Sequence, residues 1–291
     1  MLSFLSMNAK RFILTLSCQD RLGIVARISN FLHTHHGFIL EMAQFGDIST
    51  NRFFLRCVFE FHESPLSLPQ FTQAFQPIAQ EFGLTWELHD PLQKPRVLFL
   101  VSTQSHCLND LLHRSRNETL PLHVAAVASN HPTLAEITEW YKIPFHYWPL
   151  SADCKEEQEE KIASLVDEQK IDLIVLARYM QILSPTLTQR LAGKAINIHH
   201  SFLPSFKGAK PYHQAHDRGV KLIGATAHYV SDQLDEGPII DQEVLRVDHT
   251  HTPTQLVELG RDIECLVLAR AIKYHIEHRV FLNGHKTVVF K

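Results

Sequence analysis

Residues 195–241 read AINIHHSFLPSFKGAKPYHQAHDRGVKLIGATAHYVSDQLDEGPIID. The stretch opens with a short apolar strand that carries Asn197 and His199 near its end. A second apolar strand, residues 221–230, runs into a loop that contains Asp235. Side chains at the carboxyl ends of strands in an open α/β sheet face the crevice in which ligands bind. The stretch therefore predicts that an amide, an imidazole and a carboxylate meet there, a set that can stabilise an oxyanion and move a proton.

The second part of the chain alternates strands with helices. Apolar runs at 97–101, 124–128 and 171–177 are typical of parallel strands that are covered on both faces. Helical patterns separate them, so right-handed crossovers and a doubly wound sheet are expected. A long amphipathic helix over 253–276 and a hairpin around an Asn-Gly turn follow. The sequence thus predicts an α/β, Rossmann-like domain with a mostly parallel sheet over 97–291.

The first ninety residues follow a different pattern. Strands with alternating polarity and two helical stripes give the order βαββαβ, with strands expected at 11–18, 38–47, 52–61 and 84–88. This order is the split ferredoxin-like arrangement, whose antiparallel sheet can be wet on one face. Asp20 is expected to cap the first helix. We therefore predict an α+β domain over 1–90, with a proline-containing linker over 91–96.

Composition narrows the class of protein. The chain has 291 residues and a formal net charge of −3, so no general attraction to nucleic acid or to an acidic membrane surface is expected. Five scattered cysteines without a C-x-x-C pair are typical of reduced thiols, and no signal peptide or membrane-spanning run is recognised. A cytoplasmic location is therefore predicted. Whether translation starts at Met1 or Met7 stays open.

Three ordered motifs in the opening stretch carry a resemblance: N-I-H-x-S-x-L-P-x-x-x-G, G-A-T-x-H-x-V and L-D-x-G-P-I-I. Together they resemble the catalytic segment of the folate-dependent formyltransferase family. The resemblance implies that Asn197 and His199 donate to the oxyanion and that Asp235 orients and deprotonates the attacking water. It also implies a pterin pocket, with substrate-binding residues at Tyr179, Met180, Gln181, Ile182, Leu183, Ser231 and Asp232. A buried apolar stretch at 180–183 is also typical of plain core.

The turn after the strand at 97–101 separates members of this family. Members with a phosphorylated acceptor have a glycine-rich loop there, because bare backbone amides bind phosphate. This chain has no glycine over 101–112 and reads V-S-x-x-x-H-C-L-x-D-L-L, which resembles the deformylase members. The resemblance implies hydrolysis of 10-formyltetrahydrofolate to formate and tetrahydrofolate, which supplies formate for purine synthesis and balances the one-carbon pool. The folate is the substrate, and no cofactor or metal is expected.

Other interpretations stay open at this point. The same catalytic residues would serve a formyltransferase with an amine acceptor, or the chain could be an amino-acid sensor with an inactive catalytic domain. A metal hydrolase would use His199, His200, His213 and His216, but their spacing is poor and adjacent residues alternate faces on a strand. His106 and Cys107 are adjacent in sequence and so are not expected to form a nucleophile pair. Whether His228 or His106 assists the site is not decided by the sequence.

The segment LSCQDRLGIVARISNFLHTHHGFILE, residues 16–41, resembles the ACT domain, a small-molecule-sensing module. The resemblance implies an effector site at Asp20, Arg21 and Gly23. Glycine or methionine is the amino-acid effector that a one-carbon enzyme of this kind suggests. Because ACT domains commonly pair edge to edge, a homo-oligomer is also expected. The alternative is that Asp20 only caps the helix and the domain only supports oligomerisation.

Overall fold

The computed structural model describes residues 10–61, 66–149, 155–203 and 211–291. Met1, Met7, Cys154 and the L-P-x-x-x-G part of the first motif lie mostly or wholly outside these ranges. The chain divides into two compact units. The first contains residues 1–93, 277–283 and 288–291, and the second contains residues 94–276 and 284–287. No helix in the described ranges is long and apolar enough to cross a membrane.

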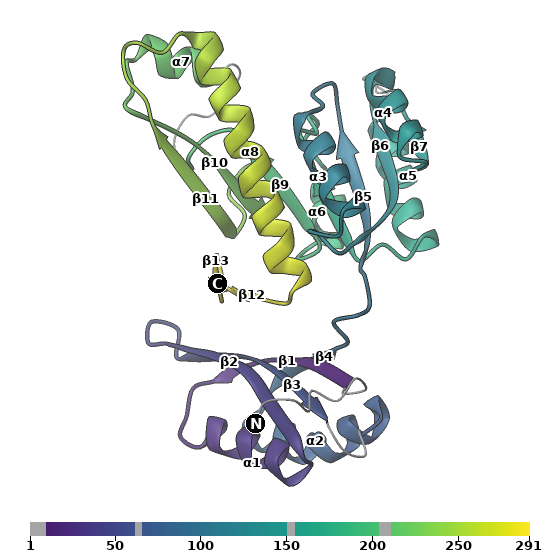
Figure 1. Ribbon diagram of the computed structural model, residues 1–291, viewed down its shortest axis with the longest axis vertical. Helices are drawn as coiled ribbons and strands as arrows, with labels where there is room; N and C mark the ends of the chain where they lie inside the picture. Colours follow the sequence, from purple (N-terminus) through teal and green to yellow (C-terminus); the bar gives the residue numbers. More distant parts are fainter. Residues whose placement is uncertain (1–9, 62–65, 150–154, 204–210) are drawn as a thin grey trace, which may run out of the picture. The chain divides into compact units, whose positions relative to one another are not determined.

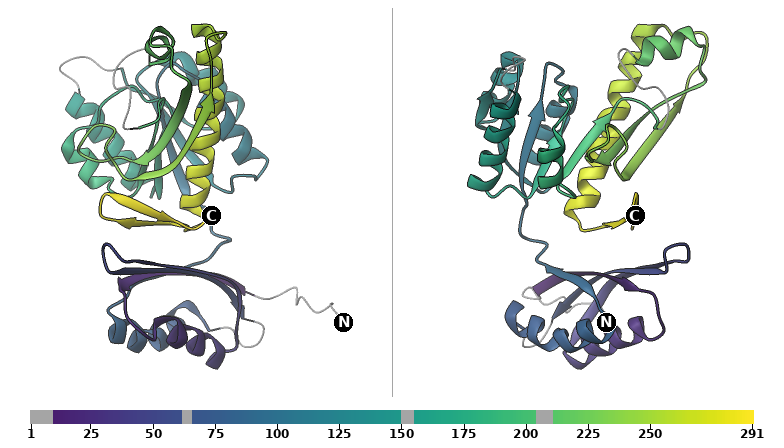
Figure 2. Two further views of the ribbon diagram at one scale, coloured as in Figure 1. Left: turned by 90° about the vertical axis from the view of Figure 1, so that its left-hand side faces the viewer. Right: turned by 180° about the vertical axis from the view of Figure 1, so that it is seen from behind.

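The first unit has the predicted order of elements. These are β1 (Lys10–Gln19), α1 (Ile24–Thr34), β2 (Gly37–Asp47), β3 (Arg52–Phe61), α2 (Leu68–Phe82) and β4 (Thr85–His89). The strands form one antiparallel sheet in the order β2-β3-β1-β4. Both helices cover the same face of this sheet (Figures 1 and 2). The structure therefore has the predicted βαββαβ order of elements along the chain and the expected antiparallel sheet.

The prediction that Asp20 caps α1 is wrong. Gly23, not Asp20, precedes the helix, and no side chain caps it. Gly23 has φ +93°, a left-handed conformation that glycine adopts at little cost, so a backbone turn starts the helix. The Asp20 backbone N–H instead donates to Asn51 O at 3.0 Å. The Asp20 carboxylate lies against Gly46, where a Cβ would come within 2.5 Å of its Oδ2.

The face of this sheet opposite α1 and α2 is also covered, whereas the alternating sequence pattern was compatible with a solvent-exposed face. Arg56 and Glu60, on the polar side of β3, are only 3% and 4% exposed. The chain's last residues supply part of the cover. Arg56 Nε donates to Glu277 O at 3.0 Å, and the Phe281 ring packs edge-on against Phe54 at 5.8 Å. The C-terminal hairpin is present as predicted, with β12 (Val280–Asn283) and β13 (Lys286–Val289).

The second unit has a seven-stranded, mostly parallel sheet in the order β11-β10-β9-β8-β5-β6-β7. Its strands are β5 (Arg96–Val101), β6 (His123–Ser129), β7 (Phe145–Tyr147), β8 (Leu173–Leu176), β9 (Ala195–His199), β10 (Leu222–Tyr229) and β11 (Ile239–Arg246). The pairs among β5 to β9 are parallel, whereas β10 is antiparallel to both of its neighbours. The predicted parallel sheet is confirmed, and β7 and β11 are strands that the sequence patterns did not predict.

Helices lie on both faces of this sheet, as a doubly wound arrangement requires. They are α3 (His106–Arg116), α4 (Ala135–Trp140), α5 (Lys155–Glu168), α6 (Pro185–Arg190), α7 (Pro211–Asp217) and α8 (Pro253–Ile276), with a short 3-10 turn at Pro132–Leu134. Figures 1 and 2 show α3 and α8 on one face and α5 on the other. The long helix α8 has the predicted bounds and packs against β9, β10 and β11.

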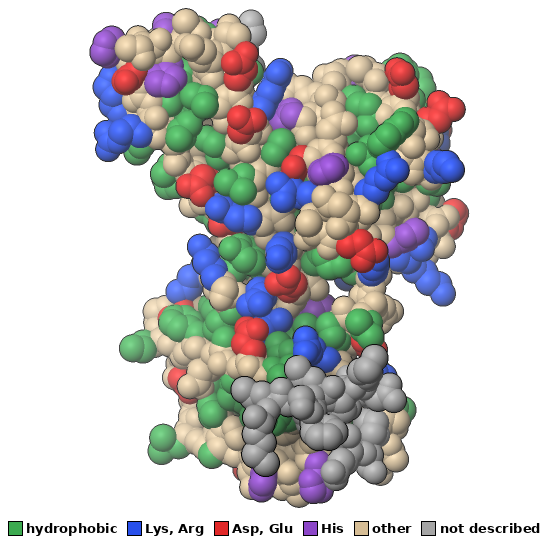
Figure 3. Space-filling view, viewed as in Figure 1, with side chains coloured by type: hydrophobic (Ala, Val, Ile, Leu, Met, Phe, Trp, Pro, Cys, Tyr) green, Lys and Arg blue, Asp and Glu red, His purple; other side chains and the backbone are tan. Residues whose placement is uncertain are grey.

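Charged side chains are mixed on the surface. On the face shown in Figure 3, Lys and Arg lie among Asp and Glu over both units, and no continuous area of one charge is visible there. Such a surface gives little electrostatic attraction to a polyanion on this face.

Candidate active site

A cavity of about 280 Å³ lies at the carboxyl ends of β8 and β9 and beside the loop after β10. All of the residues predicted to bind or convert a substrate line it: Asn197, His199, Asp235, Tyr179, Met180, Gln181, Ile182, Leu183, Ser231 and Asp232. These residues come from three segments of the chain, and they meet because side chains at the carboxyl ends of neighbouring strands face the same crevice. Met180 and Ile182 are 57% and 59% exposed, so they form an apolar wall rather than core.

Tyr179 and Met180, in the segment after β8, are held in place by hydrogen bonds. The Tyr179 hydroxyl donates to Gln158 Oε1 at 3.2 Å, so the residue presents its ring and not its hydroxyl. The Met180 backbone N–H donates to Ser102 Oγ at 3.1 Å, which ties the segment to the end of β5. Leu183 is buried and serves both the core and the cavity wall. The segment is a wall with fixed backbone, which suits a flat, partly apolar ligand.

The buried His199 pairs with Asp235, which is partly buried. His199 ends β9 and is 6% exposed, and its Nδ1 lies 3.1 Å from Asp235 Oδ2. Asp235 sits in the loop between β10 and β11 with φ +58°, a strained conformation for a residue other than glycine. Burial acts to raise the pKa of Asp235, but the interactions with His199 and His228 outweigh it and hold the pKa well below its usual range. Asp235 is therefore a carboxylate at neutral pH and acts as acceptor for the imidazole.

Asn197 and His228 face each other across neighbouring strands, in register. The Asn197 amide lies 3.3 Å from His228 Nε2, and His228 Nδ1 donates to Tyr229 O at 2.8 Å. His228 Nε2 is also 3.7 Å from Asp235 Oδ1. His228 therefore lies at the site, where its Nε2 is close to both the Asn197 amide and the Asp235 carboxylate.

His199 and His200 lie side by side. Their ring centroids are 4.8 Å apart with an interplanar angle of 23°. The expectation that they alternate faces is wrong because β9 ends at His199 and the chain bends directly after it. The proposed set of four metal-binding histidines is not brought together, since His213 and His216 are exposed residues of α7.

Gly237 fixes the loop that carries Asp235. A Cβ at this buried position would lie 1.7 Å from Tyr229 O and 2.8 Å from Tyr229 C. Both are backbone atoms, and the Tyr229 N–H donates to Pro238 O at 2.9 Å, so neither side can move freely. Only a glycine lets the loop return this close to β10, which explains the glycine of the L-D-x-G-P-I-I motif.

We therefore expect Gly237→Ala to lower the free energy of unfolding by about 1–3 kcal/mol, as overpacking does. It should also lower kcat by about 10–10²-fold, because Asp235 is displaced with the loop. Gly219→Ala is the control: Gly219 has φ +61° and open space where an added methyl group would lie, so the change introduces strain without a clash. Urea denaturation and turnover measure both effects. Equal kcat for Gly237→Ala and the wild type contradicts the argument.

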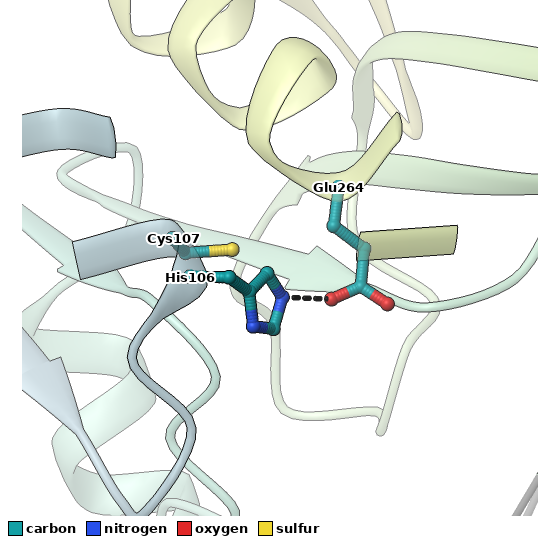
Figure 4. Close-up of side chains that lie close together, drawn as sticks. All are labelled: His106, Cys107 and Glu264. Atoms are coloured by element: carbon teal, nitrogen blue, oxygen red, sulfur yellow. Dashed lines mark hydrogen bonds and ion pairs between the residues drawn. The ribbon is translucent and has the colours of Figure 1, made fainter. Parts of the chain in front are cut away.

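A polar cluster that the sequence patterns did not predict lies next to the site. Glu264 on α8 is 1% exposed and accepts a hydrogen bond from His106 Nε2 at 2.7 Å (Figure 4). It also accepts one from the Tyr212 hydroxyl at 3.0 Å. Arg178 Nε lies 3.5 Å from the same carboxylate, which is ion-pair distance without a hydrogen bond. A sequence signal existed, because Glu264 lies between Ile263 and Val267 on the apolar stripe of α8. A charge on such a stripe needs a buried partner.

This cluster does not fit a metal ion. His106, Cys107 and Glu264 offer ligand atoms within 4.8 Å of one another. However, Arg178 is a permanent cation beside the same carboxylate and would repel a metal. The pKa of Cys107 is raised well above its usual value by a hydrogen bond with Cys265 and by burial, so it is a thiol and neither a ligand nor a nucleophile. The cluster is an ion-pair network.

Comparison with known proteins agrees with this geometry. A family model described as formyl transferase matches residues 95–272. A formyltetrahydrofolate deformylase from Corynebacterium sp. (strain P-1) is 50% identical over 281 residues, which is 97% of this chain and 98% of that protein. One from Escherichia coli (strain K12) is 43% identical over 284 residues, 97% of this chain and 99% of that protein.

Solved structures give the same result. The crystal structure of formyltetrahydrofolate deformylase from Burkholderia mallei has a TM-score of 0.93 and 50% identity, covering 97% of this chain and 100% of its own. Glycinamide ribonucleotide transformylase 1 from Symbiobacterium toebii has a TM-score of 0.65 and 26% identity, covering 68% of this chain and 95% of its own. The predicted formyltransferase fold is confirmed. The chain belongs to the formyl transferase family and shares nearly its whole length with relatives named formyltetrahydrofolate deformylase.

Proposed function

We propose that this chain is a hydrolase that converts 10-formyltetrahydrofolate and water into tetrahydrofolate and formate. One observation carries the proposal. Asn197, His199 and Asp235 lie together in one cavity, in a chain that is 50% identical over 281 residues to a formyltetrahydrofolate deformylase. The apolar wall of Met180 and Ile182 offers the pterin ring a flat surface. Ser231 and Asp232, at the start of the loop that carries Asp235, supply polar groups to the same cavity.

The reaction needs one bond made and one broken at the formyl carbon. The water oxygen attacks that carbon, the C–N10 bond breaks, and N10 leaves with a proton as tetrahydrofolate. Asn197 and His199 donate to the oxygen that becomes negative in the tetrahedral intermediate, where a fixed donor is worth about 10²–10³ in rate. His199 then hands its Nε2 proton to N10, and because Nδ1 keeps the proton that faces Asp235, the donor in this step is the imidazolium form.

Asp235 has two expected tasks, to orient the water and to take its proton. The low pKa of Asp235 favours the first task, because a weakly basic carboxylate accepts a hydrogen bond well but a proton poorly. Its contact with His199 Nδ1 at 3.1 Å adds a third task, since it holds the imidazole with Nε2 directed away from the pair. After product release Asp235 gives the water proton to solvent and His199 regains a proton on Nε2 from solvent, because Nδ1 already carries the proton that faces Asp235.

Formate release from 10-formyltetrahydrofolate by the purified chain, with no amine present, tests the proposal. We expect stoichiometric formate and tetrahydrofolate. Folate binding without formate release would contradict hydrolysis and favour the formyltransferase alternative, in which an amine is the acceptor. Loss of activity on treatment with a chelator would instead favour a metal hydrolase. An amino-acid sensor with an inactive domain is favoured only if neither formate release nor formyl transfer to an amine is detected.

Residues 1–90, the main part of the first unit, are proposed to be a regulatory ACT-like domain, with the linker over 91–96 and the catalytic domain over 97–291. The segments 277–283 and 288–291 of the latter range group with the first unit. The βαββαβ order and the turn at Gly23 support the ACT-like assignment. Asp20 and Gly23 are exposed, whereas the Arg21 guanidinium donates to Glu81 O and stacks over the Phe82 ring at 4.6 Å. Calorimetric titration with glycine and with methionine tests the effector site, and no heat from either contradicts it. The homo-oligomeric state and the cytoplasmic location stay predictions.

A further inference from the structure

A continuous chain of polar contacts leads from the core to the cavity. It starts at Glu264, the buried carboxylate of α8 that binds His106 Nε2 at 2.7 Å. Arg178 is paired with the same carboxylate through Nε at 3.5 Å. The other side of the guanidinium reaches His200, with Arg178 Nη1 2.7 Å from His200 Nδ1. The position of the His200 ring is therefore set by a charged group that is itself held from the core.

This contact fixes where His200 carries its proton. A guanidinium only donates hydrogen bonds, so His200 Nδ1 must be the acceptor and carries no proton. The pKa of His200 is lowered to about 4, mainly by burial; the charges of Arg178 and His199 also lower it, while those of Glu264 and Asp235 raise it. Near neutral pH the imidazole is thus neutral, and its one proton is on Nε2.

The Nε2 atoms of His199 and His200 are both buried and without a hydrogen-bond partner. Both histidines line the cavity, and their rings are stacked at 4.8 Å. Buried polar groups in folded proteins nearly always have a partner, and those that lack one mark functional sites. In the part of the chain that the structure describes, these two nitrogens and Arg178 Nε are the buried side-chain polar atoms without a hydrogen-bond partner.

Given the proposed hydrolysis, we propose that His200 is a further catalytic residue, which donates from Nε2–H to the formyl oxygen beside His199. Arg178, Glu264 and His106 are positioning residues that hold His200 in this tautomer. The donation transfers no proton, so the balance of the reaction is unchanged. His200 differs from His199 in this respect: a neutral donor held by an arginine keeps its hydrogen bond through the whole cycle, while His199 gives up its proton and regains it.

Two substitutions at position 200 test the donor. His200→Phe keeps the ring size and removes the donor, and we expect kcat to fall by about 10²–10³-fold with little change in KM. His200→Gln places an amide N–H near the position of Nε2 and should recover part of the loss. His213→Gln, at an exposed position of α7, is the matched control and should behave as the wild type. Equal kcat for His200→Phe and the wild type overturns the proposal, as does equal loss in the Phe and Gln variants.

The positioning residues are tested by the state of the imidazole. ¹⁵N NMR of the wild type should show His200 as the neutral Nε2–H tautomer near neutral pH. In Arg178→Met, loss of the donor and of the positive charge should give a mixture of tautomers, and the pKa of His200 should rise because a cation that lowers it is gone. An unchanged tautomer in Arg178→Met contradicts the positioning role. The NMR result does not depend on the substrate, and failure of the proposed hydrolysis would appear separately, as a wild type that releases no formate.

Discussion

Asp235→Asn is expected to lower kcat for formate release by about 10³–10⁴-fold, with little change in the Kd for folate. The amide keeps the shape of the carboxylate, so the cavity that holds the pterin ring is preserved. It loses the negative charge that faces His199 Nδ1 at 3.1 Å. An amide also cannot take the proton of the attacking water, and it does not stabilise the doubly protonated imidazole of His199 as a carboxylate does.

The control for this prediction is Asp262→Asn, the same change at an exposed position of α8. It should leave kcat and folate binding at wild-type values. Single-turnover formate release and equilibrium folate binding measure the two quantities separately. Unchanged turnover in Asp235→Asn would remove Asp235 from the mechanism, and loss of folate binding would show that its role is in binding rather than in chemistry.

The pH dependence of stability gives a second view of the same carboxylate. The pKa of Asp235 is lower in the folded chain than in the unfolded chain, so its ionised form stabilises the fold. This contribution is complete above the unfolded-state pKa of about 3.9 and is lost as the pH falls through the lower folded-state value. The free energy of unfolding of Asp235→Asn should therefore depend less on pH in acid than that of the wild type.

The sequence was sufficient to predict that Asn197, His199 and Asp235 meet in one cavity, because their placement depends on short-range rules. Asn197 and His199 end one apolar strand, and Asp235 follows another, so the strand-end rule brings them together without knowledge of distant contacts. Gly237 of the L-D-x-G-P-I-I motif is evident in the sequence, but the sequence does not show why a glycine is needed there. The close approach of Gly237 to the Tyr229 backbone exists only in the folded loop.

The missed features depend on contacts between distant parts of the chain. His106 and Glu264 are 158 residues apart, and Arg56 and Glu277 are 221 residues apart. No periodicity within a helix or strand encodes such pairs, since periodicity reports which face is buried and not what covers it. This is why Arg178 and His200 were not assigned together, and why the covered second face of the first sheet was not predicted.

Glu264→Leu is expected to lower the free energy of unfolding by about 3–5 kcal/mol, the usual effect of removing one partner from a buried ion pair. Leucine fits the apolar stripe of α8, so packing is largely kept. What is lost is the acceptor for two hydrogen bonds, from His106 Nε2 and the Tyr212 hydroxyl, and the ion-pair partner of the Arg178 guanidinium. Arg178 cannot lose its charge, and its side chain is only 10% exposed, so an unpaired cation would remain in the interior.

Glu243→Leu is the matched control for urea denaturation. Glu243 also pairs with an arginine, Arg270, at 2.9 Å, but it is 39% exposed. Arg270 keeps Asp241 as a partner at 2.6 Å when Glu243 is lost. The control should therefore change the free energy of unfolding by no more than about 1 kcal/mol. Similar decreases in the free energy of unfolding of Glu264→Leu and Glu243→Leu would show that the burial of Glu264 does not increase its contribution to stability.

The double variant Glu264→Leu/Arg178→Met separates stability from catalysis. If the loss in Glu264→Leu comes from an unpaired buried cation, removing that cation should recover most of it, because replacing both partners of a buried pair by apolar residues is often close to neutral. Turnover should not recover, since His200 then lacks the donor that fixes its Nδ1 as an acceptor. A stable but slow double variant would mean that the buried pair is present for the orientation of His200, at a site where an apolar core would have been as stable.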